Sequence, residues 1–104
     1  MHVIASFTLV PIDAGISLSP YIAACSRCLA DSGLAVETHA NGTNLEGEWD
    51  AVFDAIRACH EAVHGMGAKR IFTSVQIGTR TDRDQRMADK LESLRRREAA
   101  DAGR

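Results

Sequence analysis

Two short motifs in the chain carry residue types that can hold a metal. His60-Glu61-Ala62-Val63-His64 reads H-E-x-x-H, the spacing at which two histidines on one helix bind zinc in metalloproteases. The apolar stripe of the helix expected here leaves both histidines at its flanks and turns Glu61 towards solvent. No third ligand is apparent in the sequence. We therefore interpret the motif as structural and keep a metal site at His60 and His64 as an alternative.

The cysteines form the second motif. Cys25-Ser26-Arg27-Cys28 is a C-x-x-C, but it lies inside an expected helix and not at the start of a helix that follows a strand. A zinc site would need a second pair of ligands, for which Cys59 and His60 are weak candidates. The sequence therefore predicts packing thiols, and without a secretion signal the three cysteines are expected to be reduced.

A pair of carboxylates is the third chemical feature. Asn41-Gly42 predicts a two-residue hairpin turn, in which residue 40 opposes residue 43 and Glu37 opposes Glu46. Like charges directly across two strands destabilise a sheet, so a cation, a shared proton or water is expected to offset them. Two exposed glutamates that swing apart would satisfy the same pattern.

The elements that must position these residues follow from alternation, helical periodicity and turn signals. Ser19 and Pro20 predict a helix start, as N-cap and first helical residue. The strands are expected at 2–10, 34–40, 43–48 and 70–77, and the helices at 20–32, 49–66 and 82–98. This order predicts an α+β fold, a ferredoxin-like βαββαβ sandwich with an additional C-terminal helix. Residues 1–98 form one domain in this interpretation, and 99–104 a frayed tail.

The last helix and the sheet each present a face with no evident partner inside the domain. Met87, Leu91 and Leu94 form a narrow apolar seam that suits a partner helix, or a helix lying loosely on its own sheet. The helix-covered sheet face is expected to carry Val3, Ala5, Phe7, Leu9, Val36, Thr38, Leu45, Ile71, Val75 and Ile77. The helices are expected to turn an apolar stripe towards it, made of Ile22, Cys25 and Leu29 in the first helix and of Val52, Ile56, Cys59, Val63 and Met66 in the second. The open face carries Ile4, Ser6, Thr8, Val10, Glu37, His39, Asn44, Glu46, Glu48, Phe72, Ser74 and Gln76. Such a mixed face predicts a contact with another subunit that encloses a polar pocket.

Composition excludes several classes of function. The 104 residues carry a net charge of −2, which argues against binding nucleic acid or an anionic membrane surface. No apolar run approaches the roughly 20 residues of a membrane span, and the N-terminus does not resemble a signal peptide. A cytoplasmic protein is therefore expected. No motif in the sequence leads us to expect a cofactor.

Several segments together resemble the small thiamine-binding protein family, also called UPF0045 or DUF77. The resemblance covers about residues 2–95. Its most specific part is Gly42-Thr43-Asn44-Leu45-Glu46-Gly47-Glu48-Trp49-Asp50, and it also includes Ser17–Ile22, His60–Val63, Met66–Arg70 and Arg80–Arg83. The resemblance implies a ferredoxin-like fold, homotetramers built as dimers of dimers, binding of thiamine or its hydroxymethylpyrimidine portion, and no catalytic residues.

The sequence and the resemblance lead to one functional hypothesis. We expect a non-catalytic protein that binds thiamine or hydroxymethylpyrimidine on the open sheet face, at a subunit interface. Glu46 is the expected recognition carboxylate, and the residues around it are Glu37, Asn44, Thr8, Ser74 and Ser6. A thiazolium cation would relieve the repulsion between the two glutamates. The alternative is a structural or regulatory homo-oligomeric module that binds a different small metabolite.

Overall fold

Over its described residues, the protein forms one sheet and three helices. The computed structural model describes residues 1–12, 15, 17–82 and 86–102. In chain order the elements are β1 (His2–Pro11), α1 (Ser19–Ala30), β2 (Ala35–His39), β3 (Gly42–Glu48), α2 (Trp49–Gly65), β4 (Ile71–Thr79) and α3 (Met87–Ala102). The α+β class, the β-α-β-β-α-β order and the additional helix were all predicted correctly.

The sheet has the order β2-β3-β1-β4, and every neighbouring pair is antiparallel. β1 and β2 therefore run parallel with β3 between them, and β3 and β4 run parallel with β1 between them. Each β-α-β unit is thus split by a strand of the other unit. The long central strand β1 pairs on both sides, which places its alternate side chains at the middle of both sheet faces.

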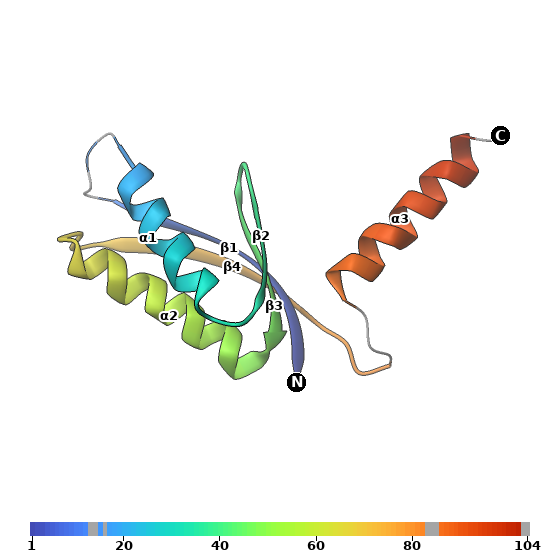
Figure 1. Ribbon diagram of the computed structural model, residues 1–104, viewed down its shortest axis with the longest axis horizontal. Helices are drawn as coiled ribbons and strands as arrows, with labels where there is room; N and C mark the ends of the chain where they lie inside the picture. The colour runs from blue at the N-terminus through green and yellow to red at the C-terminus, as the bar shows by residue number, and fades with distance from the viewer. Residues whose placement is uncertain (13–14, 16, 83–85, 103–104) are drawn as a thin grey trace.

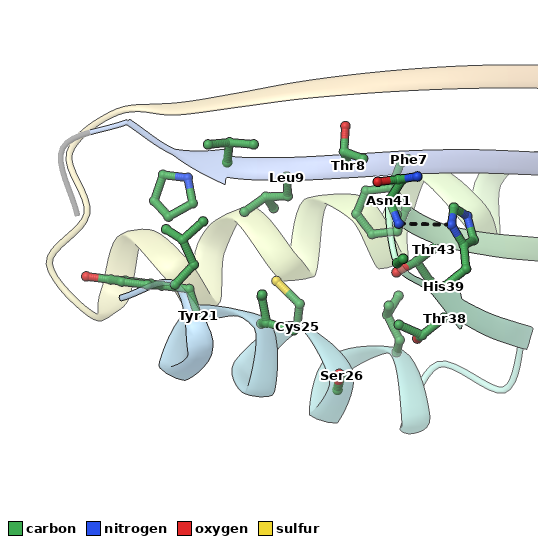
Figure 2. A pocket seen from close by; sticks show the side chains of 17 residues that line it. Phe7, Thr8, Leu9, Tyr21, Cys25, Ser26, Thr38, His39, Asn41 and Thr43 are labelled. Atoms are coloured by element: carbon green, nitrogen blue, oxygen red, sulfur yellow. Dashed lines mark hydrogen bonds between the residues drawn. The ribbon is translucent and has the colours of Figure 1, made fainter. Parts of the chain in front are cut away.

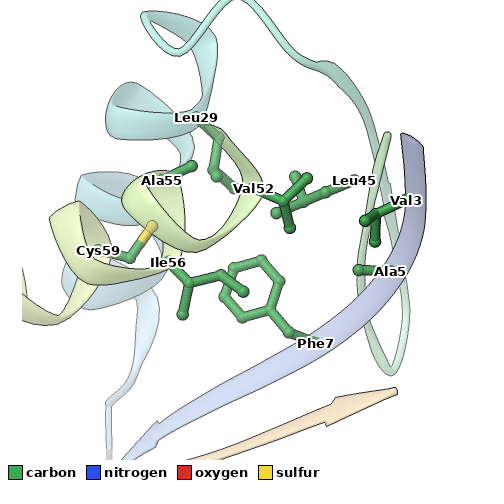
Figure 3. Packing of buried hydrophobic residues seen from close by; sticks show 9 residues of the cluster. All are labelled: Val3, Ala5, Phe7, Leu29, Leu45, Val52, Ala55, Ile56 and Cys59. Atoms are coloured by element: carbon green, nitrogen blue, oxygen red, sulfur yellow. The ribbon is translucent and has the colours of Figure 1, made fainter. Parts of the chain in front are cut away.

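Helices α1 and α2 cover one face of the sheet, and the hydrophobic core lies between the two layers (Figures 1 and 3). β1 contributes Val3, Ala5 and Phe7, whose side chains alternate with those of the opposite face. The rest of the cluster comes from β3 and the helices and comprises Leu29, Leu45, Val52, Ala55, Ile56 and Cys59. Cys25 and Cys28 pack against this cluster, as predicted for packing thiols.

The core predicted from the sequence includes residues that the structure exposes at the ends of the helices. Ile22 on α1 is 55% exposed, and Met66 is exposed just beyond the end of α2. Val75 and Ile77 lie on the helix-covered face of β4 as predicted, since they pair with Phe7 and Ala5. They are nevertheless 37% exposed, because α2 packs against β1 and β3 and leaves the edge strand β4 largely uncovered.

The hairpin register differs from the prediction by one residue in each strand. The turn consists of Ala40 and Asn41, and Gly42 already belongs to β3 and pairs with His39. Glu37 therefore opposes Asn44, and Glu46 opposes Ala35, so the predicted opposition of Glu37 and Glu46 is wrong. The pairing partner of Glu37 shifts by two residues, from Glu46 to Asn44, so Glu37, Asn44 and Leu45 keep their predicted faces. His39, predicted on the open face, instead lines a pocket on the helix side at the end of the hairpin.

Two helix boundaries also differ from the prediction. The N-cap of α1 is Leu18, whose carbonyl oxygen accepts hydrogen bonds from the Tyr21 and Ile22 amides, so Ser19 is not the cap. α3 begins at Met87 and runs to Ala102, whereas the prediction placed it at 82–98. Residues 83–85, in the predicted first turn, and 103–104 lie outside the described part of the chain. An ion pair between Arg97 and Asp101, one turn apart, supports the extra turn at the C-terminal end.

α3 projects away from the two-layer body (Figure 1). The radius of gyration is 16.1 Å, against about 13 Å for a compact chain of this length. None of the described residues of α3 is buried, and Leu91 and Leu94 of its apolar seam are exposed.

Candidate functional site

A row of four polar side chains crosses the open face of the sheet. Ser6 on β1 pairs with Asn44 on β3 and with Gln76 on β4, and Asn44 pairs in turn with Glu37 on β2. Directly paired residues hold their Cβ atoms about 5 Å apart on the same face. Gln76, Ser6, Asn44 and Glu37, called the polar row below, therefore form one line of hydrogen-bonding groups that ends in a carboxylate.

The polar row lines a pocket of about 400 Å³, called the sheet-face pocket below. One wall comes from the first turn of α3, which contributes Met87, Lys90 and Leu91. The remaining lining residues are Ile4, Ala5, Ile77 and Gly78. The pocket thus combines amides, a hydroxyl and a carboxylate with apolar side chains and one amino group.

Three of the six predicted site residues, Ser6, Glu37 and Asn44, meet in this pocket. Thr8 and Ser74 pair with each other in the next position along β1 and β4, outside the lining of the pocket. Gln76 was placed on the open face but not among the predicted site residues. The sequence marked Met87 and Leu91 as part of an apolar seam, but it did not show that they form a wall of this pocket, because such a seam suits a partner helix equally well.

Glu46, the predicted recognition carboxylate, lies on the open face but does not line the pocket. Its side chain is only 8% exposed, and its Oε2 atom accepts a hydrogen bond of 2.7 Å from the backbone N–H of Met87. The Nε2 atom of His2 lies 3.5 Å from the same oxygen and has no hydrogen-bond partner among the described residues. Glu46 therefore fastens the first residue of α3 to the sheet.

A second pocket of about 280 Å³ lies on the opposite side of the sheet, between α1, the end of β1 and the β2–β3 hairpin (Figure 2). We call it the helix pocket. Its walls include Phe7, Leu9, Tyr21, Cys25 and Thr43. Leu18, Tyr21, Ile22, Gly42 and Thr43 in this lining belong to two of the segments that carry the family resemblance. Sequence reasoning missed this pocket, because periodicity does not show how far a helix stands from its sheet.

The two histidines of the H-E-x-x-H motif make separate structural hydrogen bonds. His60 Nε2 lies 2.6 Å from the hydroxyl of Thr73 on β4, and His64 Nδ1 lies 2.7 Å from the Ala68 carbonyl oxygen. Burial, with a smaller contribution from His64, lowers the pKa of His60. In the described part of the chain, no three His, Cys, Asp or Glu residues are grouped closely enough to hold a metal ion.

The thiols lie between α1 and α2. Cys59 Sγ lies 3.8 Å from the Cys25 carbonyl oxygen, and Cys28 Sγ lies 3.8 Å from that of Ala58. A hydrogen bond between the thiols of Cys59 and Cys25 lowers the pKa of Cys25, and the same contact together with burial raises the pKa of Cys59. All three cysteines are free.

Among the described residues, no helix has the length and apolarity needed to cross a membrane.

Comparison with known proteins assigns the family. A family model described as "Thiamine-binding protein" matches residues 5–95. UPF0045 protein sll0230 of Synechocystis sp. is 52% identical over 94 residues, which are 90% of this chain and 78% of that protein.

Two solved structures agree with that assignment. The hypothetical protein MJ1052 of Methanocaldococcus jannaschii matches with a TM-score of 0.82 and 30% identity, over 89% of this chain and 95% of that one. A domain of unknown function DUF77 from Bacillus cereus matches with a TM-score of 0.79 and 26% identity, over 88% of each chain. The chain belongs to the thiamine-binding protein family, whose members by sequence and structure include UPF0045 and DUF77 proteins.

Proposed function

We propose that this chain is a non-catalytic binding protein for thiamine or its hydroxymethylpyrimidine portion. The observation that carries the proposal is the polar row, which brings an amide, a hydroxyl, a second amide and a carboxylate into one pocket. An aminopyrimidine offers ring nitrogens as acceptors and an exocyclic amine as donor, which these groups can match. Membership of a family described as thiamine-binding supports the same ligand.

Within the pocket, the parts of the ligand have different partners. The pyrimidine ring would lie against Ser6, Asn44 and Gln76, with Met87 and Leu91 of α3 packing on it. The thiazolium of thiamine carries a permanent positive charge, and Glu37 at the end of the row is the lining carboxylate that can attract it. Glu46 would act on the ligand only through α3, because its oxygen is already bonded to Met87.

We further propose that the protein works as a homo-oligomer, in which a second copy closes the open face of the sheet. Phe72, 63% exposed, and Val10, 43% exposed, pair with each other on that face. Exposed apolar groups beside a polar pocket are typical of an interface that encloses a ligand. A tetramer built as a dimer of dimers is the assembly we propose.

The split β-α-β arrangement supports placing the fold in the ferredoxin-like class.

Isothermal titration of the purified protein with thiamine and with hydroxymethylpyrimidine tests this function. Saturable binding of either compound in the micromolar range supports it, and the absence of heat with both contradicts it. Glu37→Gln should weaken thiamine by about tenfold, the order expected when one charge-assisted contact becomes neutral. The same variant should leave hydroxymethylpyrimidine unchanged, because that ligand carries no cation.

Two further variants locate the site. Asn44→Ala should weaken both ligands, since it removes one amide from the middle of the row. Asp50→Asn removes one carboxylate, as Glu37→Gln does, but on α2 in the other layer, so it should weaken binding of neither ligand. If Asn44→Ala binds both ligands with the same dissociation constants as the unmodified chain, the sheet-face pocket is not the binding site.

A further inference from the structure

The three cysteines come together where α1 packs against α2. Cys25 and Cys28 are three residues apart, so they lie on the same side of α1, and both pack against the core cluster that contains Cys59. Two contacts run in opposite directions between the helices. The Sγ atom of Cys59 lies 3.8 Å from the carbonyl oxygen of Cys25, and that of Cys28 lies 3.8 Å from the carbonyl oxygen of Ala58. Folding therefore brings a third thiol, 34 residues from Cys25, to the C-x-x-C motif.

Cys25 and Cys59 differ in their access to solvent. Cys25 is partly exposed and lines the helix pocket, with its sulfur directed towards β1 (Figure 2). Cys59 has 0% of its surface exposed and lies in the core between the two layers (Figure 3). A small oxidant dissolved in water can therefore reach the sulfur of Cys25, whereas the surrounding side chains shield that of Cys59.

The same two thiols differ in acidity. A hydrogen bond between them lowers the pKa of Cys25, and this effect is larger than the opposing effect of burial. The same hydrogen bond, together with burial, raises the pKa of Cys59. Cys59 is therefore the donor and Cys25 the acceptor. Oxidation by peroxides follows thiolate character and exposure, and both are greater at Cys25 than at Cys59.

We propose that Cys25 is a site of reversible oxidation by hydroperoxides, and that Cys59 resolves the oxidised form as an intramolecular disulfide between α1 and α2. The Cys25 thiolate attacks one oxygen of hydrogen peroxide. The O–O bond breaks, an S–O bond forms, and the released hydroxide takes up a proton to give water, which leaves Cys25 as a sulfenic acid.

The second step forms the disulfide. The sulfur of Cys59 attacks the sulfur of Cys25, the S–S bond forms, and the S–O bond breaks. Hydroxide leaves and takes the thiol proton of Cys59, which gives a second water. Overall, two thiols are oxidised to one disulfide and one hydrogen peroxide is reduced to two waters. A thiol reductant reverses the change by exchange with the disulfide.

Geometry selects Cys59 and not Cys28 as the resolving thiol. Residues three apart on a helix hold their Cβ atoms about 5–6 Å apart. A disulfide requires about 3.5–4.5 Å between these atoms, so a bond between Cys25 and Cys28 would distort α1. Cys59 comes from the facing helix, and its thiol already contacts that of Cys25.

The disulfide would change how firmly α1 is held. Among the described residues of α1, Ala24 and Leu29 are the buried ones. A bond to Cys59 would fasten the middle of α1 to the core and close a loop that contains β2 and β3. Disulfides stabilise a fold mainly by restricting the unfolded chain, and more so for longer loops. The oxidised protein should therefore unfold at a higher urea concentration and exchange the amides of α1 more slowly.

Tryptic mapping without reduction identifies the pair directly. Trypsin cleaves after Arg27, Arg57 and Lys69, so each cysteine falls in its own peptide, 1–27, 28–57 or 58–69. The full-length protein is reduced, freed of reductant, treated with a small excess of hydrogen peroxide and blocked with N-ethylmaleimide before digestion. We expect peptide 1–27 linked to peptide 58–69, and dithiothreitol should remove this link. In concentrated urea the preference should disappear, because it depends on the folded geometry.

Three variants separate the roles of the thiols. Cys25→Ser should lose the link and the rapid reaction with peroxide. Cys59→Ala should stop at the sulfenic acid, which dimedone traps on peptide 1–27. Cys28→Ser is the matched control, since it removes a thiol from the same side of α1 and should form the link at the unmodified rate. Circular dichroism checks that each variant folds.

Four outcomes would overturn the proposal. A dominant link that includes peptide 28–57 would assign a different pair. Dimedone on peptide 28–57, and not on 1–27, in a folded Cys59→Ala protein would make Cys28 the reactive thiol. Loss of the link in a folded Cys28→Ser protein would give Cys28 an obligatory part. The absence of any intramolecular link after peroxide treatment would leave the three thiols with a packing role alone.

Discussion

The carboxylate of Glu46 on β3 accepts the backbone N–H of Met87, the first residue of α3, at 2.7 Å. The two residues are 41 positions apart, so this contact joins a helix that is exposed along its described length to the middle of the sheet. A carboxylate at a helix N-terminus satisfies an amide that has no partner within the helix and interacts favourably with the helix dipole. Glu46 therefore caps the N-terminus of α3 from a distant strand, whereas a helix is usually capped by the side chain of the residue just before it.

Replacing Glu46 by Ala should release the first turn of α3. We expect faster hydrogen exchange in residues 87–91 and a loss of stability of about 1–3 kcal/mol, the usual effect of removing a buried partner from a charge-assisted hydrogen bond. Exchange measured by mass spectrometry and unfolding in urea check both parts. Unchanged exchange in α3 would mean that the helix is held by other contacts.

A backbone variant isolates the same hydrogen bond. Met87→Pro removes the N–H but keeps the helix, because proline is well tolerated at the first helical position. We expect it to accelerate exchange in the rest of the first turn as Glu46→Ala does. Met87→Ala removes the side chain and keeps the N–H, so it should have a much smaller effect. Equal effects of the two Met87 variants would assign the anchoring to the side chain.

Truncation of Leu45 should show where the stability of the domain resides. Leu45 is fully buried on β3, paired with Ala5 and Val36, and Leu45→Ala should cost about 2–5 kcal/mol through lost burial and a cavity. The matched variant Leu94→Ala on α3, where the side chain is 54% exposed, should change stability by less than about 0.5 kcal/mol. Chemical denaturation of both proteins measures the difference, and similar losses would show that α3 is packed in solution.

Two glycines should respond to alanine in opposite directions. A Cβ at Gly42 would lie 2.8 Å from the Phe7 carbonyl oxygen, so Gly42→Ala should push β3 from β1 and cost about 1–3 kcal/mol. A Cβ at Gly65, the last residue of α2, would meet nothing within 4 Å. Gly65→Ala should therefore stabilise by up to about 1 kcal/mol. Thermal unfolding of the two variants should shift in opposite directions, and a stabilising Gly42→Ala would contradict the pairing described.

His60 should make the protein less stable in mild acid. Burial lowers its pKa below the ordinary value of 6.5, so the unfolded chain binds the proton more readily than the folded one. Stability attributable to His60 is therefore present above 6.5 and falls as the pH drops from 6.5 towards the lower folded pKa. His60→Gln cannot titrate, so its melting temperature should fall less than that of the unmodified chain between about pH 8 and about pH 5.5. An equal fall in both proteins would assign the acid sensitivity to other groups.

Most of the local structure could be predicted because it follows from local signals. Alternation along β1 placed Val3, Ala5 and Phe7 on the core face, and the helical stripe of α2 identified Val52, Ile56, Cys59 and Val63. Those assignments depend on residues a few positions apart, and they agree with the structure. The same alternation placed Ser6, Asn44, Glu37 and Gln76 on the open face.

The features that could not be predicted depend on contacts between distant segments. Asn41-Gly42 is a strong signal for the centre of a turn, yet the close approach of Phe7 requires glycine at position 42 within β3 and moves the turn back by one residue. Glu46 had the expected type and face, but its partner proved to be a helix amide 41 residues away. The exposed start of α1, and with it the helix pocket, depends on how the helix docks and not on its own periodicity.

The polar row crosses all four strands, so its geometry depends on the strand that is held most weakly. Every residue of β2 is exposed, and β2 is paired only through β3 within the described part of the chain. Strands with little burial open locally at lower free energy than the core. When β2 separates from β3, Glu37 leaves the row while Ser6, Asn44 and Gln76 stay in place. A ligand that contacts all four residues would oppose this opening, so hydrogen exchange in β2 would report occupancy of the pocket from the edge of the sheet.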